Sequence, residues 1–345
     1  MKKLFVIANW MQGTGLSGGD RIFIELVKRW QLKFNISLFL SKEGSAICQR
    51  YELGKINQQI WASDFMTRWG YFVDIIYRTI NSIIKVFSVK TVSGDIIFSS
   101  SDFWPDSLPA LILKRRNPEI IWIAGFYLFA PKPWKKDSPY RGKNFLTGLL
   151  YWIGQLPTYY IIRKFADIVF VTSQPDVDQF ITNTRSKERV IVIRGGVDTV
   201  SAKYYLNSKN VIPPEKRIYD ACFVGRFHYQ KGVLELIKIW KTVCLKIPKA
   251  HLVMIGTGPL DKEVNSLIKN LGLSKNIYLA GFLDGSKKFK IFKQSRLVVH
   301  PATFDSGGMA AAEAMAWGLP GVSFDLKALK TYYPKGMLKT SCFDT

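Results

Sequence analysis

The chain has 345 residues, of which 48% are hydrophobic, so it can form two folded domains of ordinary size. Its 49 Lys and Arg residues outnumber 26 Asp and Glu residues, and the net charge of +23 indicates a polyanionic partner such as a phosphorylated substrate or an anionic membrane. No spacing typical of a nucleic-acid-binding motif is present, so we expect no nucleic-acid partner. The cysteines and the three histidines are scattered, which favours a reducing compartment and argues against disulfides and a metal site.

Short apolar runs alternate with longer helical patterns along the first 196 residues. A parallel sheet covered by helices on both faces produces this alternation, because its strands are buried on both sides. We therefore predict an N-terminal Rossmann-like domain over residues 1–196. Its predicted strands are residues 4–8, 36–40, 96–99, 120–124, 168–172 and 190–194.

A glycine-rich segment follows the first predicted strand. Residues 13–21 read Gly-Thr-Gly-Leu-Ser-Gly-Gly-Asp-Arg and precede a helical pattern that begins at Ile22. The segment lacks the G-x-G-x-x-G spacing of dinucleotide-binding folds, so by itself it fits a turn as well as a binding loop. Gly18 and Gly19 would allow a ligand to approach the backbone closely, because neither has a Cβ.

The middle of the first domain combines aromatic, basic and apolar residues. The strand predicted at 120–124 runs into an aromatic loop at 125–129, which either accepts a hydrophobic substrate or belongs to the core. A basic cluster comes next, followed by an apolar run at 145–162 that Gln155 and Pro157 interrupt. This combination fits a contact with an anionic membrane or, alternatively, a solvated loop, and a membrane span is a further alternative. The cations of the cluster are Lys132, Lys135, Lys136, Arg141 and Lys143.

A polar stretch at residues 197–216 separates the first series of strands from a second. The stretch ends in Pro213-Pro214, and we expect it to be a linker. The second series predicts another Rossmann-like domain over residues 217–345. Its predicted strands are residues 219–224, 251–255, 277–280, 297–300 and 321–324, the last of which we expect to end near Phe324.

Two cations lie at the end of the strand predicted at 219–224. Arg226 follows the strand directly, and Lys231 comes just before a helix that begins at Val233. Ligands of open parallel sheets collect at the carboxyl ends of strands, where two cations could clamp a diphosphate. The alternative is a solvated loop with ordinary surface cations. We expect His228 to be a loop residue rather than a catalytic base.

A second motif follows the strand predicted at 297–300. Asp305 comes just before a glycine pair that opens an Ala/Met-rich helix, and Glu313 lies two turns inside that helix. The free N–H groups and the dipole at a helix N-terminus favour an anion, and carboxylates accept hydrogen bonds from hydroxyls. A nucleotide sugar, which has a diphosphate between two sugars, matches these groups. Alternatively, the alanines only pack the helix on the sheet, with Asp305 as its cap. The candidate anion-binding amides are those of Ser306, Gly307, Gly308 and Met309.

Together the two motifs resemble the retaining GT-B glycosyltransferases of family 4 (glycosyltransferase group 1). Asp305, seven residues and Glu313, followed by A-M-A-W-G-L-P, are similar to the E-x7-E signature of that family. Asp305 stands where the family usually has Glu, which shortens the reach of the carboxylate by one methylene. Residues 225–232 match the family pattern G-R-x-x-x-x-K-G. The resemblance is strong over residues 224–325 and weaker in the first domain.

The resemblance implies a GT-B fold, with the parallel sheets of two Rossmann-like domains facing each other across a cleft. It also implies that the N-terminal domain, residues 1–196, binds the acceptor and that the C-terminal domain, residues 217–345, binds the nucleotide sugar. It also implies catalytic roles at the donor site. Arg226 and Lys231 would hold the pyrophosphate. Glu313 would accept hydrogen bonds from ribose hydroxyls, and Asp305 from hydroxyls of the transferred sugar. In this family the anomeric configuration is retained without a metal or a protein nucleophile.

Weaker motifs add to the expected donor site. Gly18 and Gly19 resemble the family loop that approaches the donor phosphates from the first domain. Many relatives carry a His after the strand equivalent to residues 120–124, and this chain has none there. We consider Asp102 or Asp106 as a carboxylate base for the acceptor, although no motif supports either residue. The residues expected to read the nucleobase are Gly281, Phe282 and Leu283.

The predicted function is transfer of a sugar from a UDP- or GDP-sugar to a glycan or lipid-linked acceptor, without a bound cofactor. We expect a cytoplasmic protein, peripheral on the inner face of the membrane. Relatives usually continue with helices after the last strand, so we expect the second domain to be incomplete at its C-terminus. The alternatives are a sugar-nucleotide epimerase of similar fold and a non-catalytic basic protein that binds membranes or polyanions.

Overall fold

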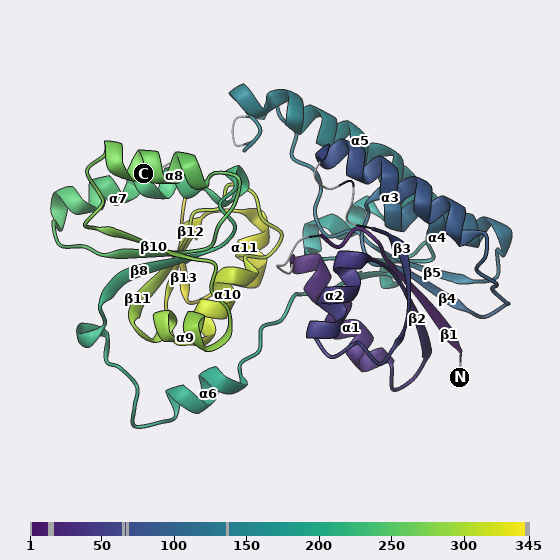
Figure 1. Cartoon of the computed structure of the whole chain (residues 1–345), viewed down its shortest axis with the longest axis horizontal. Helices are drawn as coiled ribbons and strands as arrows, with labels where there is room; N and C mark the ends of the chain where they lie inside the picture. The colour runs from purple at the N-terminus through teal and green to yellow at the C-terminus, as the bar shows by residue number, and fades with distance from the viewer. Residues whose placement is uncertain (1, 13–16, 64–65, 67–68, 136–137, 342–345) are drawn as a thin grey trace. The chain divides into compact units, whose positions relative to one another are not determined.

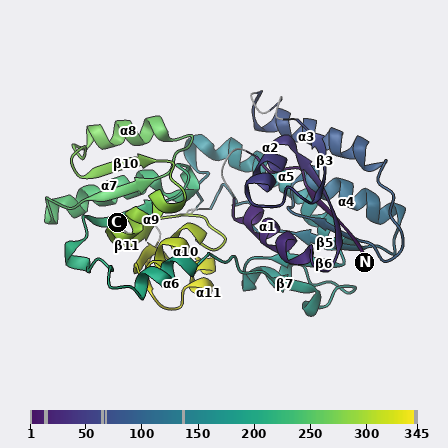
Figure 2. The same cartoon turned by 60° about the horizontal axis from the view of Figure 1, so that its bottom comes forward.

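The computed structural model describes residues 2–12, 17–63, 66, 69–135 and 138–341. Contacts divide the chain into two compact units, each an α/β domain built on one parallel sheet (Figures 1 and 2). Unit 1 consists of Met1–Ala130 and Leu149–Gly195, and unit 2 consists of Pro131–Gly148 and Gly196–Thr345. Unit 2 thus includes a segment from the middle of the chain, whereas the sequence predicted only one break, at residues 197–216.

The sheet of unit 1 has seven parallel strands in the order β3-β2-β1-β4-β5-β6-β7. Its centre is fully buried: Val6 of β1 pairs with Leu38 of β2 on one side and Phe98 of β4 on the other. The strands are β1 (Lys3–Ala8), β2 (Asn35–Ser41), β3 (Asn57–Ala62), β4 (Ile96–Ser99), β5 (Ile121–Gly125), β6 (Ile168–Val171) and β7 (Val190–Val192).

Helices cover both faces of this sheet, and each face has its own apolar core. Residues of α1 and α2 contribute to one core, and residues of α3, α4 and α5 contribute to the other. The helices are α1 (Gly18–Trp30), α2 (Lys42–Arg50), α3 (Tyr71–Val86), α4 (Trp104–Arg116) and α5 (Phe145–Phe165). The apolar run predicted at 145–162 lies in α5. Within the described residues, no helix has both the length and the apolar character needed to cross a membrane.

The sheet of unit 2 has six parallel strands in the order β10-β9-β8-β11-β12-β13. The strands are β8 (Tyr219–Val224), β9 (Leu252–Ile255), β10 (Ile277–Gly281), β11 (Ser295–His300), β12 (Gly321–Phe324) and β13 (Met337–Thr340). The helices are α6 (Val200–Leu206), α7 (Val233–Lys246), α8 (Asp261–Asn270), α9 (Gly285–Lys293), α10 (Met309–Ala316) and α11 (Lys327–Tyr332). Short 3-10 turns are η2 (Gly142–Asn144), η3 (Gln174–Gln179), η4 (Lys187–Arg189), η5 (Pro214–Lys216) and η6 (Tyr229–Lys231).

Both sheets follow the strand order of a Rossmann-like domain, which confirms the predicted fold class. In such a sheet the chain builds outward in both directions from a central strand, and ligands bind where the direction changes. This switch point lies between β1 and β4 in unit 1 and between β8 and β11 in unit 2.

Two edge strands, β3 and β13, were not predicted from the sequence. β3 is polar and mostly exposed at its start, so it lacks the apolar run of a central strand. β13 follows the strand that we expected to be the last, so the prediction that the final strand ends near Phe324 was wrong; Met337 of β13 pairs with Gly321 of β12. Residues 197–216, expected to be a linker, contain α6, whose Tyr205 packs on Trp317 in the core of unit 2.

Candidate functional site

The loops after β8 and β11 meet at the switch point of unit 2. Lys231 ends the first loop, and its Nζ lies 2.5 Å from Oδ2 of Asp305 in the second. The backbones are joined as well, because the N–H of Thr303 donates to the carbonyl of Gln230 at 3.0 Å. The fold therefore brings together a predicted cation and a predicted carboxylate at the place where Rossmann-like sheets bind their ligands.

The carboxylate of Asp305 organises the second loop. Its Oδ1 accepts hydrogen bonds from the N–H groups of Gly307 (3.1 Å) and Gly308 (2.9 Å). Its Oδ2 contacts Lys231, and Nε2 of His300 lies 3.2 Å away. Burial by itself raises the pKa of Asp305, but Lys231 and His300 hold it well below its usual range. Asp305 is thus an ionised, buried anion with both oxygens occupied.

The glycine pair before α10 is required by close packing. Gly308 is the N-cap of α10 in the left-handed region (φ +60°), and a Cβ there would lie 2.8 Å from the side chain of Leu329. The buried Tyr333 fixes the pair from the other side, because its hydroxyl lies 2.8 Å from the carbonyl of Gly307 and 3.0 Å from that of Gly308. The sequence had not singled out Tyr333, since it lies beyond the motif.

Arg226 is exposed on a loop whose backbone is held firmly. Within the described part of the chain, the Arg226 side chain makes no hydrogen bond or ion pair. The next residue, Phe227, is buried, and its N–H donates to the carbonyl of Thr257 at 3.0 Å. Gly256 permits this contact, because a Cβ there would lie 1.9 Å from the carbonyl oxygen of Gly225. The loop at 256–259 therefore supports the position of Arg226.

His228 and Tyr140 complete the first loop. Nδ1 of His228 accepts a hydrogen bond from the N–H of Gln230 at 3.3 Å. Burial and the charges of Arg226 and Lys231 lower the pKa of His228 to about 4, so it is neutral at pH 7. Nε2 of Gln230 donates to the Tyr140 hydroxyl at 3.1 Å. Tyr140 belongs to the segment that joins unit 2 from the middle of the chain, and no motif in the sequence indicated it.

Glu313 is held by a cation that we had not predicted. Nζ of Lys288 on α9 lies 2.9 Å from Oε1 of Glu313 on α10 and 3.1 Å from Oδ1 of Asp284. Lys288 is nearly buried, so the pair is shielded from water. The spacing of Asp284 and Lys288 on one helix was visible in the sequence, but the contact between α9 and α10 was not.

The segment predicted to read a nucleobase lies at the end of β10. Gly281 adopts φ +68°, and its carbonyl accepts a hydrogen bond from the N–H of Gly256 at 2.8 Å. This bond connects the segment to the loop that supports Arg226. The Phe282 side chain is 59% exposed, whereas Leu283 packs against the core. An exposed aromatic ring at a strand end is a suitable surface for stacking a base.

Gly18 and Gly19 belong to unit 1. They form the first turn of α1, which a capping box between Ser17 and Asp20 starts. A Cβ at Gly19 would lie 2.9 Å from the ring of Tyr127, whereas nothing lies within 4 Å of a Cβ at Gly18. Residues 13–16 of the predicted glycine-rich segment lie outside the described residues.

The two candidate base residues lie at the switch point of unit 1. Asp106 is fully buried, and its Oδ1 accepts from the N–H groups of Asn9 (2.7 Å) and Trp10 (3.1 Å). Burial raises the pKa of Asp106 to about 7 and that of Asp102 to about 6. Asp102 accepts a hydrogen bond from Gln155 at 2.8 Å. Asp106 therefore ties the loop after β1 to α4, and this structural role occupies its carboxylate.

The described residues contain no group of three or more His, Cys, Asp or Glu side chains placed to hold a metal ion. The positive charge at the loops after β8 and β11 comes from Arg226 and Lys231.

Comparison with known proteins shows which proteins this chain is similar to. Residues 207–333, which contain both motifs, match the family described as Glycosyl transferases group 1. An uncharacterized glycosyltransferase of Methanocaldococcus jannaschii is 28% identical over 249 residues, which are 71% of this chain and 58% of that protein. A second uncharacterized glycosyltransferase of this organism is 36% identical over 100 residues, or 29% of this chain and 25% of that protein. The chain therefore spans 58% and 25% of the lengths of these relatives.

Solved structures share the whole fold. HepE of Anabaena, in a crystal structure with UDP, superposes with a TM-score of 0.65 over 99% of this chain and 86% of that chain, at 17% sequence identity. At this identity the likeness concerns the fold, with its two Rossmann-like domains. The match over residues 207–333, the glycosyltransferase relatives and the shared fold agree with one another, and residues 207–333 are similar to the glycosyl transferases group 1 family.

Proposed function

We propose that this chain is a glycosyltransferase that moves a sugar from a nucleotide diphosphate sugar to a glycan or lipid-linked acceptor. The observation that carries the proposal is the contact between Lys231 and Asp305 at the switch point of unit 2, with the unpaired guanidinium of Arg226 on the same loop as Lys231. Two cations at this position suit a diphosphate, and the family match over residues 207–333 agrees with this ligand.

The donor would be held by charge and by hydrogen bonds. Arg226 offers a planar fork of N–H donors and Lys231 a point charge, so together they would neutralise the diphosphate. Glu313, oriented by Lys288, would accept hydrogen bonds from ribose hydroxyls. The exposed ring of Phe282 would stack on the base. HepE, which has a similar fold, was solved with UDP, and this supports UDP as the first nucleotide to test.

The main role that we propose for Asp305 is to position Lys231 and the loop before α10. A carboxylate offers about four lone-pair sites, and those of Asp305 already face Lys231, His300 and two backbone N–H groups. A hydroxyl of the transferred sugar would have to replace one of these donors. We therefore propose that Asp305 mainly positions Lys231 and the loop before α10, and that a sugar hydroxyl displaces His300 when the donor binds.

We propose transfer with retention of configuration and without a metal. The bond between the anomeric carbon and the phosphate oxygen breaks, a bond to the acceptor oxygen forms on the same face, and the acceptor proton passes to the departing phosphate. Arg226 and Lys231 would stabilise the charge that develops on the nucleotide diphosphate, which is the largest electrostatic demand of the step. No nucleophilic side chain is required for this path.

We also propose a cytoplasmic location, peripheral at the membrane. The net charge of +23 supports an anionic surface as a partner. The predicted basic cluster supports it as well, except that Lys136 lies outside the described residues. The other cations of the cluster, all exposed, are Lys132, Lys135, Arg141 and Lys143.

Calorimetric titration with UDP and GDP tests the donor site. We expect one nucleotide to bind, and Arg226→Ala to weaken binding by about 10- to 100-fold, because a charge-assisted hydrogen bond is worth roughly 1.5–3 kcal/mol. Lys262→Ala, which removes an exposed cation of α8, is the control and should bind like the wild type. A folded protein that binds neither nucleotide would contradict the proposal.

The reaction is tested with the sugar nucleotide that matches the bound base. Release of the nucleotide diphosphate with transfer or slow hydrolysis of the sugar supports a transferase. Conversion of the donor into an isomeric sugar nucleotide would instead support an epimerase. Tight binding without any turnover, over a panel of sugars and acceptors, would favour a non-catalytic binding protein.

A further inference from the structure

The exposed face of α3 is apolar. Phe72, Ile76, Ile80 and Ile84 recur every four residues, so they lie along one side of the helix. The side chains of Ile76 and Ile80 are 52% and 51% exposed, and that of Ile84 is 65% exposed. A helix on the surface of a globular domain normally turns such residues toward the core. The exposed residues of α3 are Tyr71, Phe72, Val73, Ile76, Ile80, Ile84 and Lys85.

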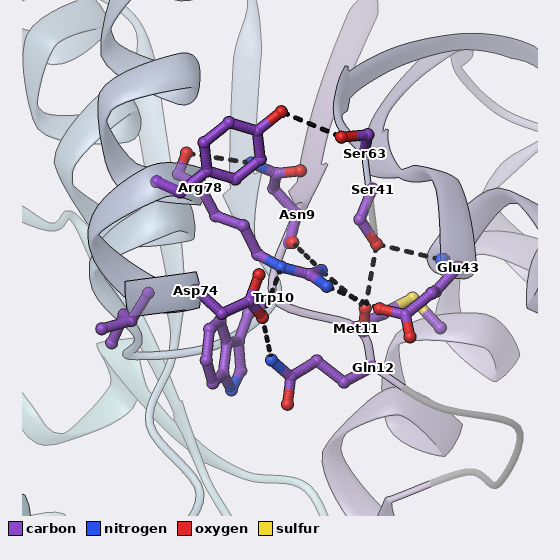
Figure 3. Close-up of polar contacts among 12 residues, drawn as sticks. Asn9, Trp10, Met11, Gln12, Ser41, Glu43, Ser63, Asp74 and Arg78 are labelled. Atoms are coloured by element: carbon purple, nitrogen blue, oxygen red, sulfur yellow. Dashed lines mark hydrogen bonds and ion pairs between the residues drawn. The ribbon is translucent and has the colours of Figure 1, made fainter. Parts of the chain in front are cut away.

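The face that α3 buries is polar instead. The guanidinium of Arg78 is fully buried and donates from Nε to Oδ2 of Asp74 at 2.9 Å (Figure 3). Its Nη2 lies 2.5 Å from Oε2 of Glu43, and its Nη1 donates to the carbonyls of Asn9 (3.1 Å) and Met11 (3.0 Å). Arg78 thus connects α3 to the start of α2 and to the loop after β1.

This network fixes the orientation of α3. If the helix rotated to bury its isoleucines, Arg78 would lose its contacts with Glu43 and with the carbonyls of Asn9 and Met11, and breaking a buried ion pair costs several kcal/mol. Gln12 adds a further constraint, because its Nε2 lies 2.5 Å from Oδ2 of Asp74 (Figure 3). The apolar face is therefore turned outward as a stable feature of unit 1, and it needs a partner that is itself apolar.

The charges around this face indicate what the partner is. The helices α3, α4 and α5 contribute to the same core, and none of them exposes an acidic side chain: Asp74 and Asp106 are buried, and α5 contains no acid. Cations gather near the C-terminal ends of α3 and α4. Arg116, for example, donates to the carbonyl of Val86 at the end of α3 at 3.2 Å. The exposed cations are Lys85, Lys90, Arg115 and Arg116.

We propose that α3 is the element by which unit 1 docks on an anionic lipid bilayer. The helix lies in the interface, with its isoleucines and Phe72 among the acyl chains and its cations at the lipid phosphates. Helix α5, of the same layer, adds the exposed apolar side chains of Leu150, Ile153 and Tyr160. This surface is distinct from the predicted basic cluster, and it would meet the lipid-linked acceptor of the proposed function.

Vesicle co-sedimentation of the whole chain tests the docking surface. The probes are vesicles of phosphatidylcholine and vesicles with about one-third phosphatidylglycerol, compared at low and high salt. We expect the double variant Ile76→Ser/Ile80→Ser to bind the anionic vesicles at least about tenfold more weakly than the wild type, because two isoleucine contacts are lost. The matched control, Ile218→Ser/Ile247→Ser in unit 2, changes isoleucines of 57% and 58% exposure and should bind within about twofold of the wild type.

Two outcomes would overturn the proposal. One is equal vesicle binding by the α3 variant and the wild type. The other is a wild-type protein that binds no vesicles and is a dimer, while the α3 variant is a monomer. That result would assign this face to a second copy of the chain. Nucleotide titration of the same variants separates the two proposals, because α3 lies outside the donor site of unit 2. If the wild type binds no nucleotide, the proposed function fails while docking stands.

Discussion

The ammonium of Lys231 lies 2.5 Å from the carboxylate of Asp305, although 74 positions separate the two residues in the chain. The contact joins the loops that leave two neighbouring strands, β8 and β11. Lys231 neutralises a buried carboxylate of the protein, and in the proposed function it also presents positive charge to a ligand. In that function Arg226, on the same loop, serves the ligand alone.

This difference predicts that two variants differ in stability. Lys231→Met leaves the Asp305 carboxylate buried without its cation, so we expect the free energy of unfolding to fall by about 2 kcal/mol, less than for a fully buried pair because Lys231 is partly exposed. Arg226→Met should change it by less than about 0.5 kcal/mol. Both should lose nucleotide affinity. Urea unfolding with calorimetric titration measures the two effects, and equal stability of the variants would contradict the assigned role of Lys231.

Asp305 also predicts a pH dependence. Its pKa in the folded state is well below the value near 3.9 of an unfolded chain, so its stabilising effect is complete above about pH 4 and is lost as the pH falls toward the folded pKa. Asp305→Asn keeps an oxygen for the N–H groups of Gly307 and Gly308 but has no charge to titrate. Its unfolding free energy should therefore fall less between about pH 5 and pH 3 than that of the wild type. Urea midpoints across this range test the expectation, and parallel curves would exclude it.

Lys288 should matter for binding although it does not contact the expected ligand. Lys288→Met removes the cation that orients Glu313, and we expect nucleotide affinity to fall about fivefold, the equivalent of roughly 1 kcal/mol. Lys287→Met removes the same charge from the exposed neighbouring position and is the matched control. Calorimetry on both variants decides: an equal loss in the two would mean that only the net charge of α9 matters.

Gly232 and Gly272 form another matched pair. Both have φ above +60°, so a side chain is strained at either position by about 1–2 kcal/mol. At Gly272 a Cβ meets nothing within 4 Å, whereas at Gly232 it would lie 1.9 Å from the carbonyl oxygen of Pro301. Gly232→Ala should therefore destabilise the protein by at least about 2 kcal/mol more than Gly272→Ala. Thermal and urea unfolding compare them, and similar losses would show that the loop after β11 can move away.

Buried central strands were predictable because an apolar run is a local property of the sequence. The strand predicted at 219–224 agrees with β8, and the glycines and charged residues that follow it marked the end of a strand. The edge strand β3 carries no such signal. β3 begins with Asn57, Gln58 and Gln59, which a strand with one unpaired edge tolerates, so its sequence is that of a polar loop.

The long-range pairs of the site could not be predicted in the same way. Arg226, Lys231 and Asp305 lie near strand or helix ends, and Glu313 lies inside α10; sequence patterns locate these elements. The pairing of Glu313 with Lys288 depends on how α9 packs against α10, and no spacing along the chain encodes that contact. For α3 the pattern predicts an amphipathic helix but not which face is inward, because the partners of Arg78 come from other elements.

The outward isoleucines of α3 have a consequence for anyone who optimises production of the protein. Ile76, Ile80 and Ile84 are at least half exposed, so polar replacements there should lower the free energy of unfolding by less than replacements of fully buried core residues, by about 1 kcal/mol each. The same replacements remove the exposed apolar face of α3 that we propose for membrane docking. A library of variants screened for soluble yield in detergent-free lysate will therefore be enriched in polar residues at these positions. The variants with the highest soluble yield will be those that no longer bind lipid vesicles.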